Sequence, residues 1–259
     1  MYDYLLTFGF FLLGAIWGSF GNVVIIRLPA KESVVTPSSA CRSCGTKIKW
    51  YDNVPILGWL FLRGKCRSCK AKISARYPLV EFIMATLFAL CFWQIGLSWT
   101  LLEVLILVFG LVVISFIDLD HMIIPNKLSY PGIIIGIIGS VLNPERPWWD
   151  GLAGLLMGGG FFWAVAFIYS ALRKKDGLGG GDIKLMAWIG AAIGWKSIPF
   201  VIFSSSIVGS FVGIFLIIRS KGNLQTSIPF GPYIAFGAIL YLIANGQKFT
   251  EWYFGIHGM

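Results

Sequence analysis

Long apolar runs without a charged residue alternate with short polar segments along this chain of 259 residues. Four of the runs extend over about 20 positions, the length that a helix needs to cross the hydrocarbon core of a bilayer; they cover 4–26, 82–102, 151–172 and 197–218. Together with the shorter runs between them, the pattern predicts eight membrane helices, at about 4–26, 78–95, 99–116, 128–142, 151–172, 185–195, 198–218 and 233–246. The predicted fold is therefore an all-α polytopic membrane protein.

The composition agrees with this prediction. Hydrophobic residues make up 57% of the chain and charged residues only 13%, whereas about a quarter of the residues in a soluble domain are charged. The net charge of +9 would suggest a nucleic-acid partner for a soluble protein, but in a membrane protein the placement of the charges matters more than their sum. The first run starts almost at Met1 without a basic segment before it, so we expect a retained helix rather than a cleaved signal peptide.

The basic residues are unevenly distributed between the loops. Residues 27–78 hold eleven Lys and Arg but only two acidic residues, so this segment is expected to lie in the cytoplasm. Eight helices then place the loops 27–78, 117–128, 172–184 and 219–232 on the same side, and these hold 18 of the 21 Lys and Arg. The predicted domains are a first transmembrane helix at 1–27, a small cytoplasmic domain at 28–78 and a membrane domain at 79–259.

Four of the five cysteines form two C-x-x-C pairs, Cys41 with Cys44 and Cys66 with Cys69, separated by 21 residues. Two such pairs can supply four thiolates to one zinc ion, which leaves no open position for water. A domain of about 50 residues has too little core to fold alone, so a bound metal would stabilise it. A redox or disulfide pair is the alternative, and a cytoplasmic location disfavours it. The sequence thus predicts a structural zinc site, with Cys91 as a small buried apolar residue.

Aromatic and basic residues lie side by side between the cysteine pairs, at 48–55. Such a segment could bind nucleic acid, or it could lie at the headgroup boundary, where Trp and Tyr collect. We favour the second interpretation, so the expected partner is the lipid bilayer and no nucleic acid. Asn22 is expected to form an interhelical hydrogen bond, and Glu81 either pairs with a base such as Arg76 or has a functional role.

Two aspartates stand at the ends of apolar runs. Asp118 ends the run at 99–117, and Asp182 follows a glycine-rich turn that contains Gly179 and Gly181. Ionisable groups at membrane depth are costly and are therefore functional candidates. The predicted topology places both at the cytoplasmic ends of their helices, where a pair of carboxylates could act as acid and base. The glycines would let a substrate backbone approach closely.

Other interpretations of these residues remain open at this point. Each aspartate could pair with a local base such as Lys184 or Lys127, and Asp120 could share the site or be solvated. A proton-coupled transporter would use the aspartates as relay sites, but it needs a continuous polar pathway, and we expect no ionisable residue in the outer halves of these helices. A zinc-containing membrane scaffold without enzymatic activity would tolerate the loss of both aspartates.

The two aspartate motifs resemble those of a known family. Asp118-x₆-Pro125-Asn126 and Gly179-x-Gly181-Asp182, followed by Lys184, resemble the motifs of the type IV prepilin peptidases. The G-x-G-D motif alone is shared with presenilin-like proteases, but the resemblance extends over nearly the whole chain. It includes both cysteine pairs and the segments 18–29, 50–55, 63–67, 76–81 and 229–232.

The resemblance implies a bifunctional enzyme of the bacterial inner membrane. Such enzymes cut the short basic leader from type IV prepilins or pseudopilins at the cytoplasmic face and then methylate the new N-terminal residue with S-adenosylmethionine. The catalytic aspartates of the family correspond to Asp118 and Asp182, and its zinc ligands correspond to the four paired cysteines. No glycine-rich cofactor motif of the soluble type is present, so the cofactor-binding residues are unknown. Asn22, Glu81 and the segment 50–53 are a hypothesis for the methyltransferase site.

Overall fold

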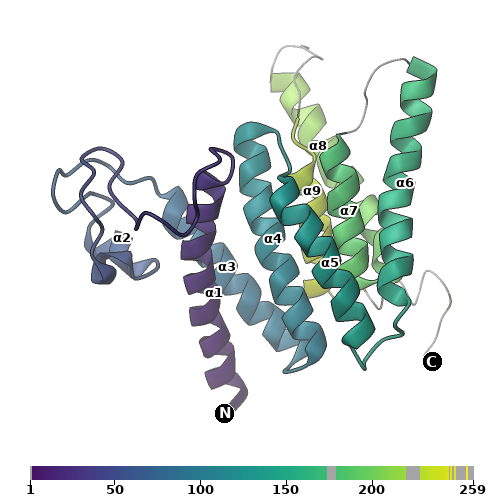
Figure 1. The fold of residues 1–259 in the computed structure, drawn as a ribbon, viewed down its shortest axis with the longest axis horizontal. Helices are drawn as coiled ribbons and strands as arrows, with labels where there is room; N and C mark the ends of the chain where they lie inside the picture. The colour runs from purple at the N-terminus through teal and green to yellow at the C-terminus, as the bar shows by residue number, and fades with distance from the viewer. Residues whose placement is uncertain are drawn as a thin grey trace. The chain divides into compact units, whose positions relative to one another are not determined.

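A computed structural model describes residues 2–173, 179–219 and 228–244, together with 246, 248 and 255. Over these residues the regular elements are all helices, and extended backbone pairs only in two isolated bridges. The chain divides into two compact units, Met1–Gly96 and Leu97–Met259, and each is described by itself (Figure 1). The three-part domain division remains a prediction. Lys174, Lys175 and Lys221, which entered the charge count, lie outside the described residues, as does the predicted interfacial tail at 252–253.

Each of the eight predicted apolar segments is helical. They form α1 (Tyr2–Arg27), α3 (Arg76–Ile95), α4 (Trp99–His121), α5 (Asn126–Leu142), α6 (Asp150–Arg173), α7 (Gly180–Ile193), α8 (Ile198–Arg219) and α9 (Gly231–Ile243). Three short helices were not predicted: η1 (Trp50–Asn53), α2 (Leu57–Phe61) and η2 (Trp195–Ser197). Five helices in the described part are long and apolar enough to cross a membrane, namely α1, α3, α4, α6 and the segment formed by η2 and α8; α5 and α9 are apolar but shorter. The chain is thus consistent with a polytopic membrane protein, and eight spans remain a prediction.

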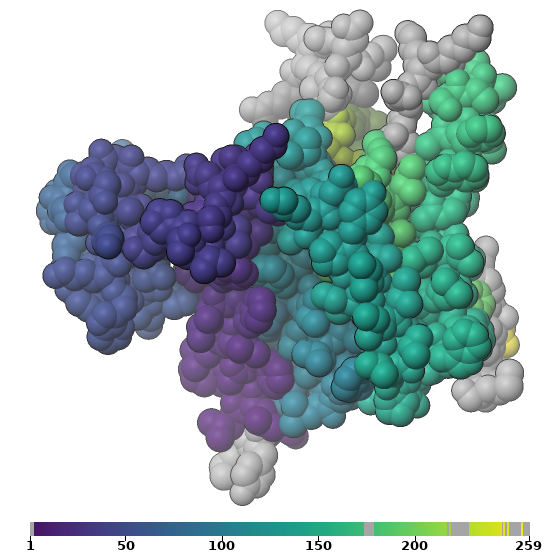
Figure 2. Space-filling view, viewed as in Figure 1, coloured from purple at the N-terminus to yellow at the C-terminus, as the bar shows by residue number. Residues whose placement is uncertain are grey.

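In unit 1, α1 and α3 pack closely along each other because small residues face the contact. A Cβ on Gly14 would lie 2.6 Å from the carbonyl oxygen of Met84, and one on Gly18 would lie 2.6 Å from the Cα of Glu81. Glycines four residues apart are typical of close helix contacts in membranes. Figure 2 shows the segment between these helices, in blue, as a lobe beside α1, in purple.

In unit 2, α7 is surrounded by α4, α5, α6 and α9, which all contact it. The indole of Trp188 fills the space that two glycines leave open: a Cβ on Gly110 of α4 or on Gly132 of α5 would overlap the ring. On the other side, Gly154 of α6 and Gly190 of α7 bring the two backbones into contact. In Figure 1, α5, α6 and α7 accordingly run alongside one another. This packing fixes the position of the first turn of α7, which carries Asp182.

Candidate functional site

Asp118 is buried in the last turn of α4, with 5% of its surface exposed. The helix ends here because Met122 adopts a left-handed conformation with φ 54° and returns its N–H to the Asp118 carbonyl. The carboxylate Oδ2 accepts a 3.0 Å hydrogen bond from the N–H of Gly231, at the start of α9. A Cβ on Gly231 would lie 2.7 Å from this oxygen, so only glycine lets the backbone approach. Asp120, two residues further on, is exposed.

Asp182 is buried in the first turn of α7, with 9% of its surface exposed. Its N–H donates to the carbonyl of Gly179, and the free N–H groups of a first turn favour a carboxylate. The glycines of the motif differ in their surroundings. A Cβ on Gly179 would lie 3.2 Å from Asp182 Oδ2, and one on Gly181 would lie 2.8 Å from the Cβ of Ile124, whereas one on Gly180 would meet nothing within 4 Å. Neighbouring atoms therefore restrict a larger residue at Gly179 and Gly181 but not at Gly180.

Ile124, in the connection between α4 and α5, joins the two aspartate segments. A Cβ built on either Gly181 or Gly231 would lie 3.3 Å from its Cδ1 atom. The backbone next to Asp182 and the backbone that contacts Asp118 therefore pack on the same side chain. The structure thus brings both predicted aspartates to one end of the helices of unit 2.

Neither aspartate forms an ion pair with another residue in the described ranges. Lys184, one of the bases that could have neutralised Asp182, donates instead to the amide oxygen of Asn126. Its ammonium group also lies 5.4 Å from the centre of the Tyr130 ring. Lys184 therefore connects α7 to the start of α5, and the interpretation in which it pairs with Asp182 is not supported.

A second group of buried polar side chains lies at the other end of α4, where the helix begins. Glu103 is 5% exposed and accepts hydrogen bonds from Arg146 Nη2 at 2.6 Å and from Asn143 Nδ2 at 3.1 Å. Arg146 also lies 3.4 Å from Asp150 Oδ2 and donates to the carbonyl of Ala191, near the end of α7. Glu103 and Asp150 therefore both have a cationic partner.

Glu103 shows that one sequence-based inference was wrong. We expected no ionisable residue in the outer halves of the helices, but Glu103 lies in the second turn of α4 and is buried. Two features of the sequence could have revealed this site: a single acidic residue inside an apolar segment, and a single Arg in the polar loop at 143–150. Between Glu103 and Asp118, α4 carries only uncharged residues. Along α4, no charged residue connects the two polar ends, which does not favour the continuous polar pathway that a proton-coupled transporter needs.

The four paired cysteines meet in unit 1. Their sulfur atoms all lie within 4.8 Å of one another, and the Cys41 and Cys69 sulfurs are 3.8 Å apart. Four sulfurs at about 2.3 Å from a tetrahedral zinc ion would be separated by about 3.8 Å. Hydrogen bonding by Thr46 lowers the pKa of Cys44 to about 6, whereas hydrogen bonding by Cys44 raises the pKa of Cys69 to about 11. The cluster could therefore hold one tetrahedral metal ion.

Two similar turns present these cysteines. In each turn the carbonyl of the first cysteine accepts the N–H of the residue four positions on, which is Gly45 after Cys41 and Lys70 after Cys66. Both residues have a positive φ, 70° and 60°. The sequence places glycine in only one of these left-handed positions, so the similarity of the two turns is clearer in the structure than in the sequence.

The aromatic and basic segment between the cysteine pairs is paired largely with Arg67 of the second cysteine turn. Arg67 donates two hydrogen bonds to Asp52, at 2.8 and 2.5 Å, and this interaction lowers the pKa of Asp52. Arg67 and Lys49 both lie over the ring of Tyr51. Trp50 is 82% exposed. The segment thus offers one large free aromatic surface, and its location at a headgroup boundary remains a prediction.

Two family models match different parts of this chain. The family model described as the bacterial peptidase A24 N-terminal domain matches residues 12–95, and the model of the type IV leader peptidase family matches residues 105–214. The boundary between them coincides with the boundary between the two units. No solved structure matches the chain.

Curated relatives share about a third of their residues with this chain over most of its length. The relatives from the three organisms below are all named prepilin leader peptidase/N-methyltransferase. The relative from Aeromonas hydrophila is 36% identical, over 94% of this chain and 92% of the relative. The one from Pseudomonas aeruginosa is 36% identical, over 95% and 93%. The one from Neisseria gonorrhoeae is 35% identical, over 90% and 89%. The chain belongs to the type IV leader peptidase family.

Proposed function

We propose that this chain cleaves the short basic leader from type IV prepilins or pseudopilins and then methylates the new N-terminal residue with S-adenosylmethionine. Its relatives carry both activities in their names. The observation that carries the proposal is the pair of buried aspartates, Asp118 and Asp182. They come from different helices, the backbone segments at Gly181 and Gly231 beside them both pack on Ile124, and they have no ion pair with another described residue.

Asp118 and Asp182 are the proposed catalytic residues. Two carboxylates that act together at one site do not both ionise readily, so we propose that the pair shares a proton. One carboxylate accepts a proton from the attacking water, and the other donates a proton to the carbonyl oxygen of the scissile bond. The N–H of Gly231 orients Asp118. Gly179 keeps side-chain atoms away from Asp182, which leaves room for the substrate backbone, whereas Gly181 lets α7 pack on Ile124.

The proposed topology has about eight transmembrane helices in the bacterial inner membrane, with residues 28–78 and both aspartates facing the cytoplasm. The supporting observation is the excess of Lys and Arg in the loops on that side. A basic leader would stay in the cytoplasm while the apolar helix of the prepilin lies in the bilayer. The scissile bond would then lie at the depth of Asp118 and Asp182. Residues 79–259 form the peptidase domain in this proposal.

The cysteine cluster is proposed to hold a structural zinc ion. Cys41, Cys44, Cys66 and Cys69 would occupy all four positions around the metal, so no water would be activated there. The metal would order a segment with little apolar core of its own. Metal analysis of the purified, reduced protein should find one zinc per chain. Finding none would contradict this part of the proposal.

Incubation of the purified full chain with a prepilin precursor, followed by mass measurement of the product, tests the whole proposal. We expect a product that has lost its leader and gained the mass of one methyl group when S-adenosylmethionine is present. The Asp182→Asn variant is the control and should leave the precursor intact. A transporter or a scaffold would leave the precursor at its full mass with every variant, which would overturn the proposal.

A further inference from the structure

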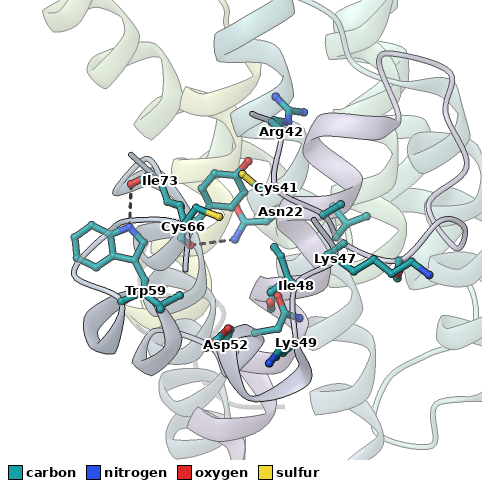
Figure 3. A pocket seen from close by; sticks show the side chains of 18 of the residues that line it. Asn22, Cys41, Arg42, Lys47, Ile48, Lys49, Asp52, Trp59, Cys66 and Ile73 are labelled. Carbon is teal, nitrogen blue, oxygen red and sulfur yellow. Dashed lines mark hydrogen bonds between the residues drawn. The ribbon is translucent and has the colours of Figure 1, made fainter. Parts of the chain in front are cut away.

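Unit 1 contains a cavity of about 1260 Å³ beside the cysteine cluster. It is lined by α1, by the cysteine turns, by the segment before α2 and by the start of α3. Figure 3 shows Cys41 and Cys66 on one side of this space and Asp52 and Lys49 on another, with Asn22 of α1 between them. Ligand sites usually measure about 300–1,000 Å³, so the cavity has room for a cofactor-sized molecule and the end of a peptide.

Glu81 is the buried carboxylate of this cavity. It comes from the second turn of α3, lines the cavity and is 8% exposed. Its Oε2 accepts the N–H of Ile56 at 2.6 Å, and the hydroxyl of Ser19 is a second hydrogen-bond donor. Both donors are neutral, and Glu81 has no ion pair with another residue in the described ranges. A buried carboxylate without a cation is costly, so the ligand that best complements this cavity is cationic.

The backbone that contacts Glu81 is strained. Ile56 has φ 62° and ψ −54°, and the N–H of Leu57 bonds to the carbonyl of Pro55 at 2.6 Å. This is a γ-turn of positive φ, which is rare even without a β-branched side chain. Strain of this kind persists where the surroundings enforce it, and it clusters at ligand sites. Glu81 enforces it here by accepting the Ile56 N–H.

Asn22 and the basic rim of the cavity add further recognition groups. The Nδ2 of Asn22 donates to the carbonyl of Tyr77 at 3.0 Å, which leaves the amide oxygen as an acceptor. Positively charged side chains at the cavity rim suit the carboxylate of an amino-acid ligand. These side chains are Arg27, Arg42, Lys47, Lys49 and Lys72. The carboxylate of Glu81 suits the ammonium group of a peptide N-terminus, and the basic rim suits the carboxylate of S-adenosylmethionine.

We propose that methyl transfer takes place in this cavity and that Glu81 binds the N-terminal ammonium of the cleaved pilin and removes its proton. This inference rests on the proposed N-methyltransferase activity. A free α-amino group has a pKa of about 7.7–8.0 and is mostly protonated at neutral pH, and only the neutral amine has the lone pair needed for attack. S-adenosylmethionine supplies the methyl group, carried on a sulfonium.

The step balances with Glu81 as the base. Glu81 takes one proton from the ammonium, and the nitrogen lone pair forms a bond to the methyl carbon while the carbon–sulfur bond breaks. The electron pair of that bond stays on sulfur, which becomes a neutral thioether. The product is a methylated ammonium, and Glu81 releases its proton to water. Ile56 and Ser19 hold the carboxylate in place through their hydrogen bonds.

The test compares the variant Glu81→Gln with the wild-type chain on a synthetic peptide that begins at the mature N-terminus, so that no cleavage is required. Gln keeps an oxygen for the Ile56 N–H but cannot take a proton. At neutral pH we expect methylation to slow about 10²-fold, the usual contribution of a general base. The loss should shrink as the pH rises above 8, because the amine then loses its proton without help. Leader cleavage and calorimetric binding of S-adenosylhomocysteine should match the wild type.

A binding measurement separates this role from a structural one. The free-amine peptide should bind Glu81→Gln about tenfold more weakly, whereas an N-acetylated peptide should bind both forms equally. Glu32→Gln is the matched control, because Glu32 lines the same cavity but is exposed, and it should behave as wild type. Wild-type methylation by Glu81→Gln, or an equal loss of cleavage and of S-adenosylhomocysteine binding, would overturn the inference. A wild-type chain that cleaves but never methylates would instead contradict the proposed function.

Discussion

The two ends of the helices in unit 2 differ in how their buried carboxylates are satisfied. At one end, Glu103 has Arg146 and Asn143 as partners. At the other end, Asp118 receives one backbone N–H, and neither it nor Asp182 pairs with a cation in the described part of the chain. Carboxylates that are buried without a cation reduce stability and are typical of sites that carry out chemistry. We therefore propose a structural role for the first end and the catalytic role for the second.

The largest expected effect comes from removing one carboxylate of the catalytic pair. Asp118→Asn keeps the size of the side chain and an oxygen that accepts the Gly231 N–H, but the pair can no longer exchange a proton. We expect leader cleavage to slow by about 10²- to 10⁴-fold, with insertion and folding unchanged. Cleavage rates measured by mass spectrometry check this. Asp120→Asn, in the same turn but exposed, is the control, and an equal loss in that variant would argue against a pair formed by Asp118 and Asp182.

At the opposite end, the expected effect is on stability. Arg146→Met leaves Glu103 buried without its cation, and breaking a buried ion pair in this way costs about 3–5 kcal/mol. Unfolding of the helices in detergent micelles, followed by circular dichroism, measures the loss. Arg146→Lys retains a charge and should lose less. If Arg146→Met were as stable as the wild type, the Glu103–Arg146 pair would not stabilise the fold, and the structural role proposed for this end would be wrong.

The glycines before Asp182 allow a sharper test at the catalytic end. A Cβ on Gly181 would lie 2.8 Å from the Cβ of Ile124, so Gly181→Ala must displace either α7 or the connection that carries Ile124. Overpacking costs about 1–3 kcal/mol, and a loss of about 1.4 kcal/mol from transition-state binding slows cleavage tenfold. Single-turnover cleavage rates measure the effect. Gly180→Ala is the matched control, since its Cβ would meet nothing within 4 Å, and equal effects of the two variants would show that packing on Ile124 is irrelevant.

The smallest effect is expected at Lys184. Its partners are Asn126 and the ring of Tyr130, not Asp182, so Lys184→Met should reduce stability by less than about 1 kcal/mol. The cleavage rate should change only a few-fold, because the charge does not contact the aspartates. Thermal unfolding and cleavage assays on the same preparation check both. A loss as large as that of Asp118→Asn would mean that Lys184 acts directly on the catalytic pair.

Sequence patterns predicted the helices and the chemical groups of the sites better than they predicted their partners. Apolar length identified the helices, and the spacing of Cys41, Cys44, Cys66 and Cys69 identified a cluster that the structure assembles. The contact between Asp118 and Gly231 joins residues 113 positions apart, and no local periodicity contains that information.

Glu103 was missed for a different reason. We treated Glu103 as part of an apolar helix and did not consider that a buried carboxylate requires a partner. That partner, Arg146, lies 43 positions away on a loop. Conformational details such as the positive φ of Ile56 and Lys70 also escape sequence reasoning, because side chains of these types rarely adopt such angles.

The most direct test of the assignment is the cleavage rate per folded molecule in two variants measured side by side, Asp118→Asn and the double variant Glu103→Gln/Arg146→Gln. Both remove buried charge, and the double variant removes both members of the Glu103–Arg146 pair, so that neither is left without the other. We predict that the double variant cleaves prepilin at close to the wild-type rate, whereas Asp118→Asn, equally folded, cleaves it at least about 10²-fold more slowly. Cleavage by Asp118→Asn at close to the wild-type rate, or an inactive but folded double variant, would contradict the division of unit 2 into a structural and a catalytic end.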